Sequence, residues 1–136
     1  MIAVDTNLLY AHRQHSQFFD RAATALRTLA ETPEHWAIPS PCIHEFLSVV
    51  TNPRIFNHPT PIELESPCLK LIGESETYWR SLAQILVHGN IVGPKVHDAR
   101  IAAICQTHGI RELWSSDRDF RRMHGVKVTN PVLHRD

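Results

Sequence analysis

Acidic side chains follow two short apolar segments that have the composition of buried strands. Asp5 comes directly after residues 2–4, and Asp117 follows residues 112–115, with Asp119 two positions further along. In open α/β sheets ligands bind at the carboxyl ends of the strands, so we expect these carboxylates to meet at one edge of a sheet. For each Asp alone the alternative stays open, because Asp after a strand is also ordinary turn chemistry.

Two further acids fall within predicted helices. At 3.6 residues per turn, Asp98 lies on the same side of its helix as the apolar Ile101 and Cys105, which is the side expected to be buried. Burying an unpaired carboxylate is costly, so Asp98 should be paired or metal-bound, although capping the helix would also explain it. Glu45 lies opposite the apolar stripe of its helix, and both a solvated position and a cleft wall remain open.

Several carboxylates at one edge would repel each other, and a hard divalent cation would relieve that repulsion. Mg²⁺ and Mn²⁺ prefer carboxylate oxygens and water as ligands. Such ions activate a water molecule and stabilise a phosphate leaving group. The acids therefore predict a Mg²⁺ or Mn²⁺ site, for which phosphodiester hydrolysis is the natural reaction.

The elements that must position these acids alternate along the chain. Short apolar segments predict strands at residues 2–4, 36–38, 112–115 and 126–128. Periodic apolar residues and capping signals predict helices at residues 16–29, 40–51, 60–72, 81–87, 97–109 and 118–124. This alternation predicts an α/β fold with a mainly parallel central sheet flanked by helices. The 136 residues show no linker, so a single domain over residues 1–136 is expected.

The composition excludes several classes of protein. Hydrophobic residues make up 43% and charged residues 21%, which is typical of a globular chain and not of a disordered one. No apolar run approaches the ~20 residues of a membrane helix. There is no secretory signal, and three cysteines without a C-x-x-C pair argue against a disulfide framework or a zinc ribbon, so a cytoplasmic location is expected. The 10 histidines form no strong metal motif, and the cysteines are most simply small apolar fillers.

The net charge of zero conceals an uneven distribution. Residues 1–68 contain 4 basic and 7 acidic residues, whereas residues 69–136 contain 10 and 7. Arg13 and Arg118 lie near the acidic motifs and are the favoured contacts to phosphates, with other arginines such as Arg100 also nearby. For each of them, a solvated helix face is an equally open alternative.

Four motifs occur in an order that is similar to one known family. They are VDTNLL at residues 4–9, Glu45 in a helix, VHDARIAA at residues 96–103 and WSSDRDF at residues 114–120. Together they resemble the PIN-domain ribonucleases and, within these, the VapC-type toxins of bacterial toxin–antitoxin pairs. The similarity spans the whole chain, including the closing Gly125 and Asn130. It implies a PIN-like, Rossmann-like fold of three layers.

The resemblance also implies an activity and assigns roles to residues. The activity is that of an endoribonuclease dependent on Mg²⁺ or Mn²⁺. The catalytic, metal-binding acids would be Asp5, Glu45, Asp98 and Asp117, with Asp119 as an auxiliary metal-binding acid. The groups that orient these carboxylates would be Asn7, Thr6, His97 and Ser116, the last standing where the family often has Thr. For His97, a capping or packing role remains open.

The family further implies partners, and some rival functions remain. An RNA substrate, a cognate antitoxin protein that inserts a segment into the groove, and a homodimer follow from the resemblance. The alternatives are a solitary PIN-type nuclease in RNA processing and a non-catalytic α/β binding module with an acidic cation site. A phosphatase of the haloacid dehalogenase type is disfavoured, because it requires a second Asp where this chain has Asn7.

Overall fold

The central feature of the fold is a five-stranded parallel sheet. The computed structural model describes residues 1–8, 19–50, 68–117, 120, 123 and 125–132, and within these it leaves the side chains of residues 19, 49 and 50 aside. The strands are β1 (Ile2–Val4), β2 (Trp36–Pro39), β3 (Leu69–Ile72), β4 (Glu112–Trp114) and β5 (Lys127–Thr129), in the order β3-β2-β1-β4-β5. All four pairings are parallel, which confirms the predicted α/β class.

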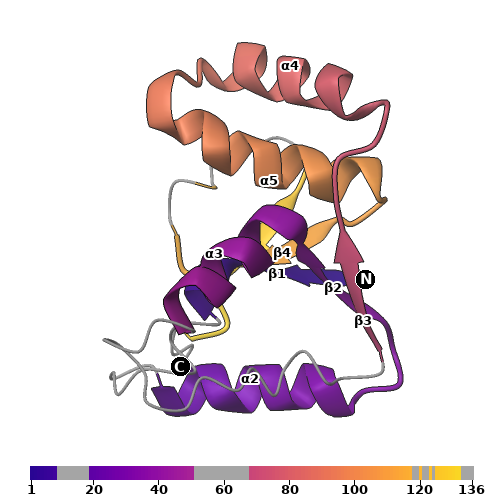
Figure 1. Cartoon of the computed structure of the whole chain (residues 1–136), viewed down its shortest axis with the longest axis vertical. Helices are drawn as coiled ribbons and strands as arrows, with labels where there is room; N and C mark the ends of the chain where they lie inside the picture. Colours follow the sequence, from indigo (N-terminus) through magenta and orange to yellow (C-terminus); the bar gives the residue numbers. More distant parts are fainter. Residues whose placement is uncertain (9–18, 51–67, 118–119, 121–122, 124, 133–136) are drawn as a thin grey trace.

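Helices cover both faces of this sheet. They are α2 (Phe19–Glu31), α3 (Ser40–Val50), α4 (Tyr78–Gly89) and α5 (Val96–Thr107), with a short 3₁₀ turn, η2 (Gly93–Lys95), before α5. Figure 1 shows α2 on one side of the sheet and α5 on the other, with α4 stacked on the outer side of α5. The predicted three layers are therefore present. No helix among the described residues is long and apolar enough to cross a membrane.

The short apolar strands form the centre of the core. Ala3 and Val4 of β1 and all four residues of β2 are buried, as expected for parallel strands that are covered on both faces. The stripe predicted for the first helix is also buried, at Ala22, Leu26 and Leu29. Because β1 is fixed on both faces, the residue that follows it is held at a defined place on the sheet edge.

One predicted helix is wrong at its end. Residues 69–72 were expected to close a helix that opens at Thr60, but they form β3 at the edge of the sheet, paired in register from Trp36↔Leu69 to Pro39↔Ile72. Backbone pairing with β2 outweighs the local helical pattern, as tertiary context often does. The start of that predicted helix, together with residues 16–18 and most of the short helix at 118–124, lies outside the described residues. Helix α4 begins at Tyr78, three residues before the predicted start.

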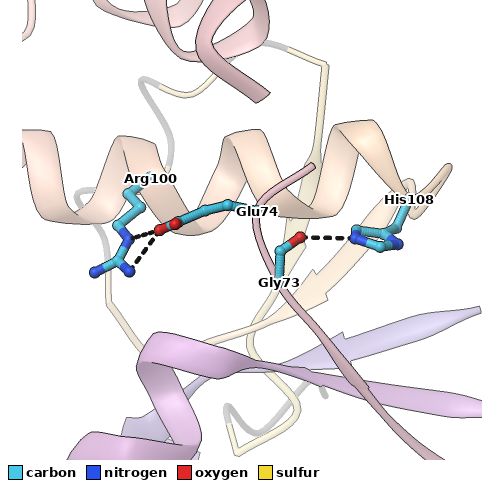
Figure 2. A network of polar contacts seen from close by, with 4 residues as sticks. All are labelled: Gly73, Glu74, Arg100 and His108. Carbon is cyan, nitrogen blue, oxygen red and sulfur yellow. Dashed lines mark hydrogen bonds and ion pairs between the residues drawn. The ribbon is translucent and has the colours of Figure 1, made fainter. Parts of the chain in front are cut away.

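Two polar contacts fasten the chain after β3 to helix α5 (Figure 2). Arg100 donates from Nε to the Glu74 carboxylate at 2.6 Å, and its Nη2 lies 2.5 Å from the same oxygen. Directly after the end of α5, the His108 ring nitrogen Nε2 lies 2.8 Å from the Gly73 carbonyl oxygen. Arg100 was one of the arginines near the acidic motifs, and the structure gives it a carboxylate partner within the chain.

We expect Arg100→Ala to lower the free energy of unfolding by only about 0.5–1 kcal/mol, because an exposed ion pair is weakened by solvent. Its two side chains are 40% and 42% exposed. Urea unfolding at low and high salt measures the effect, which should shrink at high salt as the charges are screened. Arg80→Ala, at an exposed position of α4, is the control. A loss of the same size at both salt concentrations would contradict an electrostatic role for the pair.

Candidate functional site

The site is built around Asp5, which follows β1. The Asp5 backbone N–H donates to the Trp114 carbonyl oxygen at 2.9 Å, so the pairing of β1 with β4 continues to this residue. After Asp5 the chain turns into a helical segment at residues 6–8, and the Leu8 N–H donates to the Asp5 carbonyl at 3.2 Å. The Asp5 residue is only 6% exposed. A carboxylate is thus buried at the carboxyl edge of the sheet, as the sequence predicts.

Three donors hold the Asp5 carboxylate. Oδ1 accepts the Thr6 backbone N–H at 2.8 Å and the Cys42 thiol at 3.3 Å. Oδ2 accepts the Ser115 hydroxyl at 2.9 Å. These donors come from the turn after β1, from the first turn of α3 and from the residue after β4. The two carboxylate oxygens are therefore held from different elements, which limits rotation of the group.

Ser115 connects the chain after β1 to the chain after β4. Its hydroxyl oxygen donates to Asp5 and accepts the Asn7 side-chain amide at 3.1 Å and the Asp117 backbone N–H at 3.0 Å. A hydroxyl has one donor and two acceptor positions, so all of them are used. The Asn7 amide oxygen in turn accepts the Ser116 backbone N–H at 3.1 Å. The network places Asp117 beside Asp5.

Burial and hydrogen bonding act on the protonation of Asp5 in opposite directions. Burial raises the pKa of Asp5 above its ordinary value, the hydrogen bonds from Ser115, Cys42 and Thr6 offset part of this, and the negative charge of Asp117 raises it further. Burial and the Asp5 charge also raise the pKa of the Cys42 thiol well above its usual range, and the same causes raise that of Cys105 to about 12. A cation at this edge would stabilise the carboxylate.

The other predicted acids occupy different positions around this centre. Asp117 is half-buried at the same edge as Asp5, Asp98 is half-buried in the first turn of α5, and Glu45 is exposed on α3. Within the described residues, no three His, Cys, Asp or Glu side chains form a group that could hold a metal ion by themselves. The structure thus links the segment of Asp117 to Asp5 through Ser115, and it places Glu45 on α3 and Asp98 on α5. Asp119, Arg13 and Arg118 lie outside the described residues.

The donor set nevertheless fits Mg²⁺ or Mn²⁺. Mg²⁺ usually keeps several waters and binds through one or two carboxylates together with substrate phosphates, so a closed cage of protein ligands is not needed. Asp5 and Asp117 would supply two such carboxylates. Burial raises the pKa of the Cys42 and Cys105 thiols, which favours oxygen ligands over thiolates here.

The groups that orient Asp5 differ in part from those that the sequence indicated. Thr6 and Asn7 lie in the network as expected. Ser116 is exposed and contributes its backbone N–H, whereas the orienting hydroxyl belongs to Ser115, which sequence reasoning missed. A Ser hydroxyl can accept the backbone N–H two residues on, as Ser115 does from Asp117, but this turn preference applies equally to Ser116 and does not identify Ser115 as the partner of Asp5.

The structure bears on two further expectations, for Cys42 and for His97. The interpretation of Cys42 as a simple apolar filler is incomplete, because its thiol donates to Asp5. His97 is exposed in the first turn of α5. A role for His97 in orienting a carboxylate therefore stays a prediction.

Comparison with known proteins gives consistent results. Residues 2–126 match the model of a family described as the PIN domain. Ribonuclease VapC48 of Mycobacterium tuberculosis is 28% identical over 133 residues, covering 91% of this chain and 92% of the relative. Ribonuclease VapC43 of the same species is 28% identical over 142 residues, covering 97% and 96%. The family resemblance seen in the four motifs is thereby confirmed.

Solved structures share the fold. VapBC2 from Rickettsia felis, bound to a DNA fragment from its promoter, gives a TM-score of 0.71 at 20% identity over 96% of this chain and 98% of that one. FitAcB from Neisseria gonorrhoeae gives 0.72 at 20% identity over 96% and 98%. The VapC20 toxin of Mycobacterium tuberculosis, described as cleaving the sarcin–ricin loop, gives 0.65 at 17% identity over 96% and 100%. The three-layer α/β architecture is common to all of them.

Proposed function

This chain belongs to the PIN-domain family, and from that premise we propose that it is a Mg²⁺- or Mn²⁺-dependent endoribonuclease, the toxin of a toxin–antitoxin pair. One observation carries the proposal. A buried carboxylate, Asp5, is held by three donors at the edge of a parallel sheet, next to a second carboxylate, Asp117. Two relatives that align over nearly their full length are named as VapC ribonucleases, which supports RNA as the substrate.

Each residue of the site has a defined task in this proposal. Asp5 and Asp117 present carboxylate oxygens to the cation. Glu45 on α3, Asp98 on α5 and Asp119 are proposed as further acids that complete the ligand set directly or through water. A divalent cation bound there supplies an activated water molecule and neutralises charge that develops on the phosphate.

The remaining groups of the chain hold this arrangement. Ser115 fixes the rotation of the Asp5 carboxylate, and Asn7 ties the chain after β1 to the chain after β4. Thr6 closes the turn by donating its backbone N–H to Asp5. Partners of a ligand are normally needed for metal affinity, since they set its orientation and basicity. We propose Arg13 and Arg118 as contacts to RNA phosphates.

The wider setting follows from the same premise. We propose that residues 1–136 act as a single domain in the cytoplasm, as a homodimer that is neutralised by a cognate antitoxin. Structures with this fold include a toxin–antitoxin complex from Klebsiella pneumoniae, together with VapBC2 and FitAcB. If a small reading frame adjoins the gene, co-expression with its product, followed by affinity purification, tests the antitoxin. Recovery of the chain alone, with no loss of its activity, would contradict it.

The activity itself is tested by incubating the purified chain with total bacterial RNA and sequencing the new RNA ends. We expect cleavage at defined positions with Mg²⁺ or Mn²⁺, complete loss with EDTA, and recovery when the cation is added back in excess. Cleavage that continues unchanged in EDTA would contradict metal dependence. Absence of any cleavage of any RNA, with or without cation, would contradict the nuclease.

Cation binding should begin to weaken at a higher pH than it would for an exposed carboxylate ligand. The ligand must lose its proton to bind, and the pKa of Asp5 is raised above 3.8, so protons compete with the cation where an exposed Asp would already be ionised. Below the raised pKa, the Mn²⁺ dissociation constant should increase about tenfold per pH unit. Isothermal titration calorimetry over a pH series measures it. A constant that does not change until the pH falls near 3.8 would contradict this effect of burial.

A further inference from the structure

The function proposed above gives Cys42 no task of its own. Its thiol nevertheless contacts Asp5, the central residue of the site. It is the third residue of α3 and is fully buried, with 0% exposure. Its Sγ lies 3.3 Å from Oδ1 of Asp5, within the range for a thiol donor. A thiol is a weak donor to a neutral acceptor, but a carboxylate acceptor makes such a bond stronger.

The backbone of Cys42 is fixed in place by the same turn that carries Asp5. The Thr6 hydroxyl donates to the Cys42 carbonyl oxygen at 3.1 Å, while the Thr6 backbone N–H donates to Asp5. Thr6 therefore contacts both partners of the thiol–carboxylate bond. The first turn of α3 and the end of β1 are joined as one unit, and the thiol is presented to Oδ1 from a constrained position.

The donor from Cys42 complements the donor from Ser115. Ser115 donates to Oδ2 from the chain after β4, and Cys42 donates to Oδ1 from α3, which follows β2. Strands β4 and β2 lie on opposite sides of β1 in the sheet. Without Cys42, Oδ1 would keep only the Thr6 backbone N–H, which belongs to the same turn as Asp5, and Ser115 would be the one remaining side-chain donor to the carboxylate. With both, its plane is set from two elements.

We propose that Cys42 is a positioning residue for Asp5: its protonated thiol donates to Oδ1 and, together with Ser115 on Oδ2, fixes the plane of the carboxylate for the cation. The consequence for cation binding rests on the proposed function, whereas the hydrogen bond itself does not.

Paired substitutions at two cysteines separate a donor from a space-filling residue. Mn²⁺ dissociation constants are measured for Cys42→Ala and Cys42→Ser, with Cys105→Ala and Cys105→Ser as controls. Cys105 is equally buried and its thiol senses the Asp5 charge, but the three donors to Asp5 come from elsewhere. For a positioning donor we expect about tenfold weaker binding in Cys42→Ala and binding within about threefold of wild type in Cys42→Ser.

A hydrogen-bond donor and a space-filling residue predict opposite orders of Mn²⁺ affinity for the two Cys42 variants. If Cys42 only fills space, the apolar Ala replaces it better than the polar Ser does. Equal or better Mn²⁺ binding in Cys42→Ala than in Cys42→Ser would therefore overturn the proposal. Both Cys105 variants should bind Mn²⁺ within about twofold of wild type, in line with residues that are not partners of a ligand. A tenfold loss in Cys105→Ala as well would show that any change in this core weakens the site, and it would equally overturn the specific role of Cys42.

An infrared measurement tests the bond without any cation or RNA. The S–H stretching band that disappears in Cys42→Ala should be the one lowered most in frequency by hydrogen bonding. It should move to higher frequency in Asp5→Asn, because an amide oxygen is a weaker acceptor than a carboxylate, while the bands of Cys68 and Cys105 stay in place. A Cys42 band that Asp5→Asn leaves unchanged would overturn the proposal. If wild-type protein binds no Mn²⁺, the proposed function fails, and this band still decides the role of the thiol.

Discussion

Replacement of Asp5 by Asn is expected to reduce metal-dependent RNA cleavage by about 10²–10³-fold, the scale of losing a principal electrostatic group of an active site. The carboxylate is buried, and its oxygens are held by Thr6, Cys42 and Ser115. The cation would neutralise the negative charge of Asp5 and of Asp117, which acts on Asp5. An amide keeps the shape but supplies no charge. Single-turnover cleavage of a defined RNA, at saturating Mn²⁺, measures the rate.

The matched control for this variant is Glu34→Gln. Glu34 is an exposed acid two residues before β2, at the opposite end of the strands from the site. It should leave the cleavage rate within about twofold of wild type, as expected for a surface substitution far from functional groups. Circular dichroism serves to check that both variants fold. A folded Asp5→Asn protein that cleaves RNA at the wild-type rate would refute the assignment of Asp5.

Ser115→Ala should damage both cation binding and stability. Its hydroxyl serves the Asp5 carboxylate, the Asn7 amide and the Asp117 backbone N–H, and its removal leaves these groups without that partner at a buried position. Loss of an orienting partner typically costs about 10–100-fold in metal affinity or activity. Leaving buried polar groups unsatisfied costs a further ~1–3 kcal/mol of unfolding free energy. Mn²⁺ titration and urea unfolding measure the two effects.

Ser116→Ala is the matched control, one residue along the chain. Ser116 is exposed and bonds Asn7 through its backbone N–H, which the substitution keeps. Its stability should change by less than about 0.5 kcal/mol, as is usual for surface positions. Equal losses in the two alanine variants would contradict the separate role assigned to the Ser115 hydroxyl.

The sequence predicted which acids lie at the carboxyl edge of the sheet better than it predicted the hydrogen bonds that they make there. Residues 2–4 and 112–115 read as buried strands because they are short and apolar, and parallel strands necessarily bring the residues that follow them to one edge. Asp5 and Asp117 were placed together on that basis, and in the structure Ser115 links the two segments by hydrogen bonds to the Asp5 carboxylate and the Asp117 backbone N–H. The strand at residues 69–72 was missed. Lys70 and Leu71 are exposed because β3 lies at the edge of the sheet, and no local sequence pattern indicates such a position.

Contacts between distant segments explain the rest of what sequence reasoning missed. Ser115 and Ser116 are neighbours with the same side chain, and only the pairing of β4 with β1 decides which hydroxyl faces Asp5. Cys42 lies 37 residues from Asp5 along the chain, and the packing of α3 against the end of β1 brings its thiol to the carboxylate. For Asp98, the helical period indicated a buried side, and the half-buried position in the first turn of α5 agrees in part with that expectation.

The most direct test of the central claim is anomalous X-ray diffraction from crystals grown with Mn²⁺. We predict one or more Mn²⁺ peaks at the carboxyl edge of the sheet, with an oxygen of Asp5 at a direct coordination distance of about 2.1 Å and Asp117 bound directly or through water. Crystals of the Asp5→Asn protein grown in the same way should lack that peak. A Mn²⁺ ion bound only elsewhere on the protein, with the Asp5 carboxylate uncoordinated at neutral pH, would contradict the account.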